Sequence, residues 1–127
     1  MMKANYFSNG LKVKKIHSLC EIDPDSILRS AASLLYTFDD SISNSLKIKL
    51  EELKISRINS EKVIDIPGKG KVGFLKTNEV KVVNEEYLRE QNIALSKRIT
   101  DLIKKEKILY FVIRNGLLIG AISFEEL

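Results

Sequence analysis

Apolar residues at helical spacing mark the first half of the chain. Asp23 and Pro24 start the first helix, because aspartate is a good N-cap and proline suits the first helical position. Apolar residues then recur at helical spacing and form one broad face: Ile27, Leu28, Ala31, Ala32, Leu34 and Leu35. After a polar, turn-like stretch from 39 to 45, a second helix is predicted, which can run on from that stretch: Leu46, Ile48, Leu50, Leu53 and Ile55.

The remaining segments have the character of strands joined by short turns. Strands are predicted over residues 10–19, 62–66, 71–76, 79–83, 108–114 and 117–124, the first of them at a sheet edge. The strongest short hairpin signal is Asn115-Gly116, between the last two strands. Two shorter helices are predicted, over residues 85–91, where Asn84 is the cap, and over 95–105.

Strands that join mostly by hairpins pair in an antiparallel sense, and helices come in pairs between them. The sequence therefore predicts an α+β fold: an antiparallel sheet of about six strands with helix pairs packed on its faces. No internal repeat or domain boundary is visible, so residues 1–127 are predicted to form a single module.

Composition narrows the function classes. Of 127 residues, 44% are hydrophobic and 30% charged, which is typical of a globular domain. The longest apolar runs are far shorter than the ~20 residues that span a bilayer, so no membrane insertion is expected. Because a single cysteine leaves no internal disulfide to form, a reducing cytoplasm is the expected location. A lone cysteine, Cys20, supports no disulfide or metal-site spacing, and no bound metal is expected. The net charge of +4 is spread among acids, so no nucleic-acid partner is expected.

The segment Ile66-Pro67-Gly68-Lys69-Gly70 stands between two predicted strands. Because glycine has no Cβ, such a pair lets the backbone approach a flat ligand closely, but a tight turn alone would also explain both glycines. Lys69 and Lys71 could meet phosphate charge or be ordinary exposed lysines. Asn84 follows the next strand, where capping a helix is a sufficient role for it.

The order of these segments resembles the nucleotide-binding domain (N-domain) of heavy-metal, copper- or zinc-type P-type ATPases. In that family an IPGKG hairpin is followed by a strand, a Gly-Asn pair and a helix. The segment Ala31-Ala32-Ser33-Leu34 resembles the helix before the family's Ser-Glu-His-Pro-Leu motif, and residues 107–122 resemble its closing hairpin. The pattern covers about residues 10 to 122, nearly the whole chain.

The resemblance implies a nucleotide site at Asp39, Asp40, Gly68, Gly70, Val83 and Asn84. Asp39 and Asp40 fall where the family's Glu and His hold the adenine ring, and an aspartate cannot stack on a base. Val83 falls at the family's glycine, where a β-branched side chain is expected to add bulk to the cleft wall. Tyr36 or Phe38 could stack instead. ATP is therefore expected to bind weakly or not at all.

Residues 1–9 fall where the family has its phosphorylation loop, as a degenerate remnant of it. The phosphorylated aspartate would fall at Met2, and no Asp-Lys-Thr-Gly-Thr motif occurs anywhere in the chain. The chain is thus expected not to be an enzyme by itself, and any parent protein would be a cation-transporting ATPase.

Two functional hypotheses stay open at this point. The first is a nucleotide-binding module that binds ATP weakly through its adenosine part, with other domains of a P-type ATPase as partners. The second is a diverged N-domain fold that has lost ATP and acts as a protein-interaction or regulatory domain. Retained Gly68, Gly70 and Asn84 favour the first, and Asp40 and Val83 favour the second.

Overall fold

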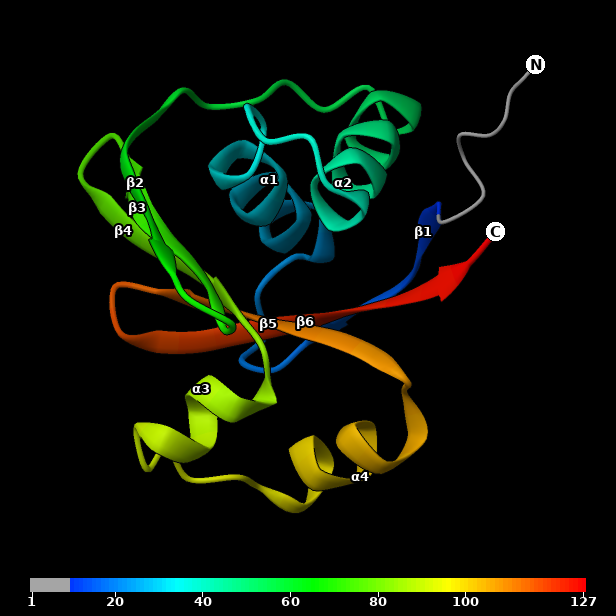
Figure 1. Cartoon of the computed structure of the whole chain (residues 1–127), viewed down its shortest axis with the longest axis vertical. Coiled ribbons are helices and arrows are strands. Elements are labelled where there is room, and N and C mark those ends of the chain that lie inside the picture. The colour runs from blue at the N-terminus through cyan, green and yellow to red at the C-terminus, as the bar shows by residue number, and fades with distance from the viewer. Residues whose placement is uncertain (1–9) are drawn as a thin grey trace.

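The computed structural model describes residues 10–127, which hold six strands and four helices (Figure 1). The predicted remnant of the phosphorylation loop, residues 1–9, lies outside the described residues, and the assignment of the whole chain to one module stays a prediction. In chain order the elements are β1 (Leu11–Ser18), α1 (Pro24–Leu34), α2 (Ser41–Glu52), β2 (Ser60–Ile66), β3 (Gly70–Leu75), β4 (Asn78–Val83), α3 (Glu85–Glu90), α4 (Lys97–Lys105), β5 (Ile108–Arg114) and β6 (Leu117–Glu126).

All six strands form one antiparallel sheet in the order β1-β6-β5-β4-β3-β2. The predicted α+β fold is confirmed, and β1 lies at a sheet edge as expected. The hairpin between β5 and β6 turns at Asn115 and Gly116, whose φ angles of 50° and 81° are those of a primed two-residue turn. Asn115 also donates and accepts hydrogen bonds at the start of β4, which fixes this turn against the sheet.

The helices lie as pairs on opposite faces of the sheet, with α1 and α2 on one face and α3 and α4 on the other (Figure 1). Each pair closes its own hydrophobic core. Leu28 of α1 and Leu46 of α2 pack in the larger core, and Leu88 of α3 and Ile99 of α4 pack in the smaller one. A central strand such as β4 is therefore buried on both faces.

Side-chain caps set where the helices begin. Asp23, Asn84 and Ser96 accept backbone N–H groups in the first turns of α1, α3 and α4. The expectation of a turn-like stretch up to residue 45 is wrong, because Asp40 caps α2 and the helix already begins at Ser41. Among residues 10–127 no helix has the length and apolar character needed to cross a bilayer.

Candidate functional site

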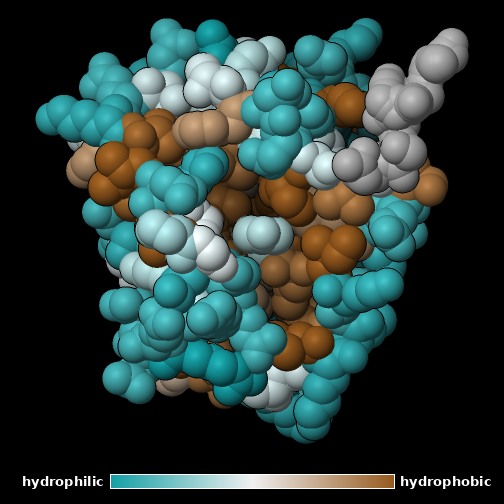
Figure 2. Space-filling view, viewed as in Figure 1, coloured by the Kyte–Doolittle hydropathy of each residue, from teal (hydrophilic) through white to brown (hydrophobic). Residues whose placement is uncertain are grey.

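A pocket of about 280 Å³ lies between the sheet and the start of α2, on the face that α1 and α2 cover. The α1–α2 segment supplies one wall, and the ends of β2 and β3 with the glycine turn supply the other. Figure 2 shows the molecule hollowed below these helices, with apolar side chains inside. The pocket is lined by Leu35, Asp40, Ile42, Ser43, Asp65, Gly68, Lys69, Gly70, Lys71, Val82 and Tyr110.

Strand register places one row of side chains across the sheet wall of this pocket. Asp65 of β2 pairs with Lys71 of β3, which in turn pairs with Val82 of β4. The Lys71 ammonium lies 2.9 Å from an oxygen of Asp65 and 4.4 Å from the centre of the Phe38 ring. Val82 is almost fully buried. The wall is thus apolar toward β4 and charged toward β2.

Gly70 is required by the close packing of the turn against β4. Its φ is 146°, and a Cβ added there would lie 2.0 Å from the carbonyl oxygen of Val82. Such a contact is impossible without moving the β4 backbone. Gly68 has a φ of 73° but open space around it, so its requirement is conformational only. Both glycines therefore have a structural role in the turn, whatever the pocket binds.

Asn84 fastens the glycine turn to α3. Its side-chain oxygen accepts the N–H of Tyr87 as the helix cap, while its amide group donates to the Gly68 carbonyl at 2.9 Å. The Asn84 backbone N–H also donates to the Lys69 carbonyl at 2.8 Å. Asn84 is the residue that holds the turn in place, and its own side chain is not among those that line the pocket.

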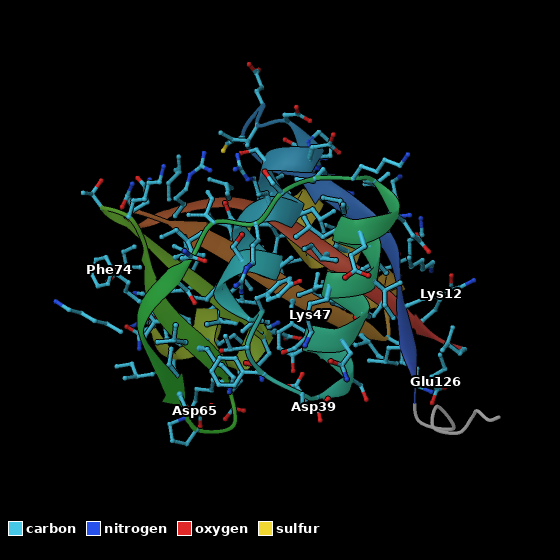
Figure 3. The ribbon with its side chains drawn as sticks, turned by 90° about the horizontal axis from the view of Figure 1, so that it is seen from above. Lys12, Asp39, Lys47, Asp65, Phe74 and Glu126 are labelled. Carbon is cyan, nitrogen blue, oxygen red and sulfur yellow. The ribbon has the colours of Figure 1, made fainter. Side chains whose placement is uncertain are left out.

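Asp39 and Asp40 separate in role. Asp40 lines the pocket, but its carboxylate accepts both the backbone N–H of Ser43, at 2.8 Å, and the Ser43 hydroxyl, at 3.1 Å. Asp39 is exposed and accepts a hydrogen bond from Asn44 at 3.0 Å. In Figure 3, Asp39 and Asp65 lie on the same side of the molecule. The loop before α2 and the glycine turn are far apart in sequence, and both line one pocket, the loop through Asp40 and the turn through Gly68 and Gly70.

The expectation that the Val83 side chain narrows the cleft wall is wrong. Val83 is fully buried in the smaller core, where it packs with Tyr87, Leu88 and Phe111. Its neighbour Val82 points to the opposite face and lines the pocket. Only the backbone of Val83 comes near the glycine turn, 2.8 Å from the position that a Cβ on Gly70 would take. The bulk of Val83 thus serves packing below the sheet.

The two candidate stacking rings already have cationic neighbours. The Arg57 guanidinium lies 4.1 Å from the centre of the Tyr36 ring, and the Lys47 ammonium 5.7 Å from it. Phe38 carries Lys71 over its ring. Neither ring lines the pocket, and a base that stacked on the ring face occupied by a cation would have to displace that cation.

Sequence reasoning missed Asp65, Val82 and Tyr110 as pocket residues. Alternation along β2 would have placed Asp65 on the same face as Val63, which packs in the larger core. The same alternation along β4 places the side chains of Val82 and Val83 on opposite faces of the sheet. Tyr110 carried no local signal. It lies on β5, two residues from the partner of Val82, and it lines the pocket only because β5 is next to β4 in the sheet.

Two other features lie apart from this pocket. A larger cavity of about 490 Å³ lies between β1 and α2 and contains none of the motif residues.

Near β1, burial lowers the pKa of His17, whose ring lies 3.2 Å from the buried Ser123 hydroxyl. The nearby ion pair with Lys14, at 2.9 Å, holds the pKa of Glu106 below its usual value. Within residues 10–127 no group of three or more His, Cys, Asp or Glu side chains could hold a metal ion.

Comparison with known proteins finds similarity in structure and none in sequence. No family model matches the chain, and no curated protein sequence matches it significantly. Among solved structures, the N-domain of HMA8, a copper-transporting P-type ATPase, superposes with a TM-score of 0.72 at 20% identity, covering 88% of this chain and 98% of that domain. The chain has the N-domain fold. The fold implied by the family resemblance is thereby confirmed.

Parts of two longer chains from ATPase structures are also similar to this fold. A zinc-transporting PIB-type ATPase matches with a TM-score of 0.78 at 15% identity, over 92% of this chain and 19% of that one. The catalytic domain of the CPx-ATPase CopB-B, from a structure on conformational changes upon nucleotide binding, matches with a TM-score of 0.65 at 15% identity, over 96% of this chain and 39% of that one. The chain thus spans only part of these longer proteins.

Proposed function

We propose that this chain is a nucleotide-binding module that binds an adenine nucleotide weakly through its adenosine part and performs no catalysis by itself. The observation that carries the proposal is the pocket between the glycine turn and the start of α2, in a chain with the N-domain fold. Its volume of about 280 Å³ lies just below the usual range of ligand pockets, ~300–1,000 Å³, which suits a nucleoside better than a whole triphosphate.

The pocket provides two kinds of contact for adenosine. Leu35, Ile42 and Val82 offer apolar surface for the base. Backbone of the turn at Gly68 and Gly70 provides a wall without side chains. The phosphates are left to face solvent near Lys69 and Lys71, so Mg²⁺ is expected to matter little for affinity. A structure similar to this chain was solved in a study of nucleotide binding, which supports the ligand class.

Weak affinity follows from Asp40. An aspartate stands where the family places a stacking ring, and base–aromatic stacking is worth ~1–3 kcal/mol. A nucleotide module that binds in the millimolar range has only ~4 kcal/mol of binding free energy in total. The loss of one stacking contact therefore removes a large share of it.

We also propose that the module acts with a P-type ATPase, as a domain of one or as a separate protein on its cytoplasmic side. The similar structures are of copper- and zinc-transporting enzymes, which supports the class of protein but not the metal. The phosphorylated aspartate would then come from another domain or chain.

A second candidate function is supported by the charges of the same pocket. Asp40 is committed to capping α2, and Lys69 and Lys71 are both paired with carboxylates. A pocket in this state suits an N-domain fold that no longer binds ATP and instead contacts a protein partner or regulates one. The two candidates differ in one measurable property, which is saturable binding of adenine nucleotide.

The test is a titration of the ¹⁵N-labelled chain with ATP, ADP and AMP, followed by the backbone amide shifts. The proposal predicts saturable changes at Gly68, Gly70 and Val82 with a dissociation constant of roughly 5 mM or weaker, because the loss of ~1–3 kcal/mol leaves ~3 kcal/mol or less of binding free energy. Changes confined to the cavity between β1 and α2, or none at ten millimolar ligand, would reject nucleotide binding at this pocket and favour the second candidate.

A pair of substitutions sharpens the test. Asp40→His restores a ring in the pocket and is expected to strengthen ATP binding by about tenfold, the equivalent of ~1.4 kcal/mol. Asp39→His is the matched control, because it makes the same change at the adjacent exposed position that does not line the pocket. Equal effects of the two substitutions would show that Asp40 is not the base contact.

A further inference from the structure

Asp65 and Lys71 form an ion pair in the lining of the proposed nucleotide pocket. They are directly opposite in the β2–β3 register, and both line the pocket. The Lys71 side chain is only 20% exposed, while that of Asp65 is 60% exposed. Phe38 covers Lys71 on a further side, with its ring centre 4.4 Å from the ammonium. Asp65 is thus the open, solvent-facing member of a pair whose lysine is already engaged.

The other cation of the pocket is engaged as well. Lys69 lies 3.3 Å from a carboxylate oxygen of Glu90, which comes from α3 across the turn. Asp40 adds a second carboxylate to the pocket lining. The described lining therefore contains two lysines and two aspartates, whose formal charges cancel. A phosphate group entering there would meet no unpaired cation and would be repelled by Asp65.

We infer that Asp65 makes this pocket selective for the nucleoside portion of its ligand, so that adenosine and AMP bind as tightly as ATP. This inference rests on the proposed function and deepens it by naming the ligand class. The carboxylate of Asp65 occupies the ammonium that a phosphate would otherwise bind, and it acts as an internal competitor of the phosphate. Asp65 is a specificity-determining residue of the site.

The magnitude follows from the exposure of the pair. Exposed ion pairs contribute little, so the competition from Asp65 is modest. Without the Asp65 charge, the Lys71 ammonium would be free to bind a phosphate. Asp65→Asn keeps the size of the side chain and removes its charge. We expect this substitution to strengthen ATP binding by about threefold to fivefold, while adenosine affinity stays unchanged within about twofold.

The experiment compares adenosine, AMP and ATP by amide-shift titration at constant ionic strength, without Mg²⁺. In the unmodified chain the three dissociation constants should agree within about twofold, and in Asp65→Asn the ATP constant alone should fall. The double variant Asp65→Asn with Lys71→Gln should return the ATP-to-adenosine ratio to that of the unmodified chain, because the freed ammonium is gone.

Asp101→Asn is the matched control. Asp101 pairs with Lys97 on α4 at the same 2.9 Å separation, outside the pocket, so its substitution changes the net charge equally. It should leave the ratio unchanged. A stepwise rise in affinity with each phosphate in the unmodified chain, or an equal effect of Asp101→Asn, would overturn the inference while leaving nucleotide binding intact. Failure of all three ligands to bind would instead overturn the proposed function, and the inference with it.

Discussion

Replacing Asn84 should loosen the glycine turn and the start of α3 together. The Asn84 side chain caps α3 through the N–H of Tyr87 at 3.2 Å and donates to the carbonyl of Gly68 at 2.9 Å. Losing an N-cap costs ~1 kcal/mol, and losing a hydrogen bond of this kind adds ~0.5–1.5 kcal/mol. Asn84→Ala should therefore lower the free energy of unfolding by about 1.5–2.5 kcal/mol.

Asn84→Asp separates the two roles. A carboxylate still accepts the helix N–H and suits the positive end of the helix dipole, but it cannot donate to Gly68. The Asn84→Asp variant should lose about 1 kcal/mol of unfolding free energy, so its stability should lie between those of the unmodified chain and Asn84→Ala. Ser96→Ala is the control, because Ser96 caps α4 and has no contact with the turn.

Urea unfolding measures these differences, and amide shifts of Lys69 and Gly70 report the turn. Both Asn84 variants should move these amides, and Ser96→Ala should not. An unfolding free energy for Asn84→Ala within ~0.3 kcal/mol of the unmodified chain, well below the cost of a lost cap, would refute the account of Asn84. So would unchanged amides at the turn.

Three further predictions follow from the same structure. Gly70→Ala should destabilise strongly and broaden the turn amides, because its Cβ would meet the Val82 carbonyl, whereas Gly68→Ala should cost only ~1 kcal/mol; equal losses in urea unfolding would contradict this. Val83→Ala should lower stability by ~2 kcal/mol without changing nucleotide affinity, because it leaves a cavity below the sheet; tighter binding in the titration would show that Val83 does wall the pocket. Burial lowers the pKa of His17, so the native state binds fewer protons there than the unfolded chain. The contribution of His17 to the free energy of unfolding should be full above pH ~6.5 and should fall as the pH drops below that value. An unchanged pH dependence of unfolding in His17→Gln would contradict this prediction.

Local signals in the sequence predicted much of the fold. Asp23 and Asn84 were recognised as caps because the capping interaction spans only a few residues. The Asn115-Gly116 turn was equally local. Asp40 was missed as a cap because the first turn of α2 is rich in serine, which resembles a loop. Ser43 and Ser45 are buried there by packing, and no local pattern reveals that burial.

The candidate site was predicted less completely because it depends on the faces of the sheet. Val82 and Val83 are both buried, on opposite faces, so their hydrophobicity does not show which one lines the pocket. The meeting of Asp40 with Gly68 was implied by the family resemblance and not by any pattern near either residue. Alternation from Val63 places Asp65 on the pocket face, but its pairing with Lys71 depends on the β2–β3 register, which shifts earlier in β2.

The most direct test of the account is to locate the base. Isotope-filtered NOE spectra of the ¹³C-labelled chain with excess adenosine report which methyl groups lie near the two carbon-bound protons of the adenine ring. The account predicts contacts to the methyl groups of Leu35, Ile42 and Val82, which line the pocket beside the glycine turn. Contacts only to methyl groups that line the separate cavity between β1 and α2, such as those of Leu11, Val13 and Ile48, would contradict it, as would no contacts at a saturating adenosine concentration.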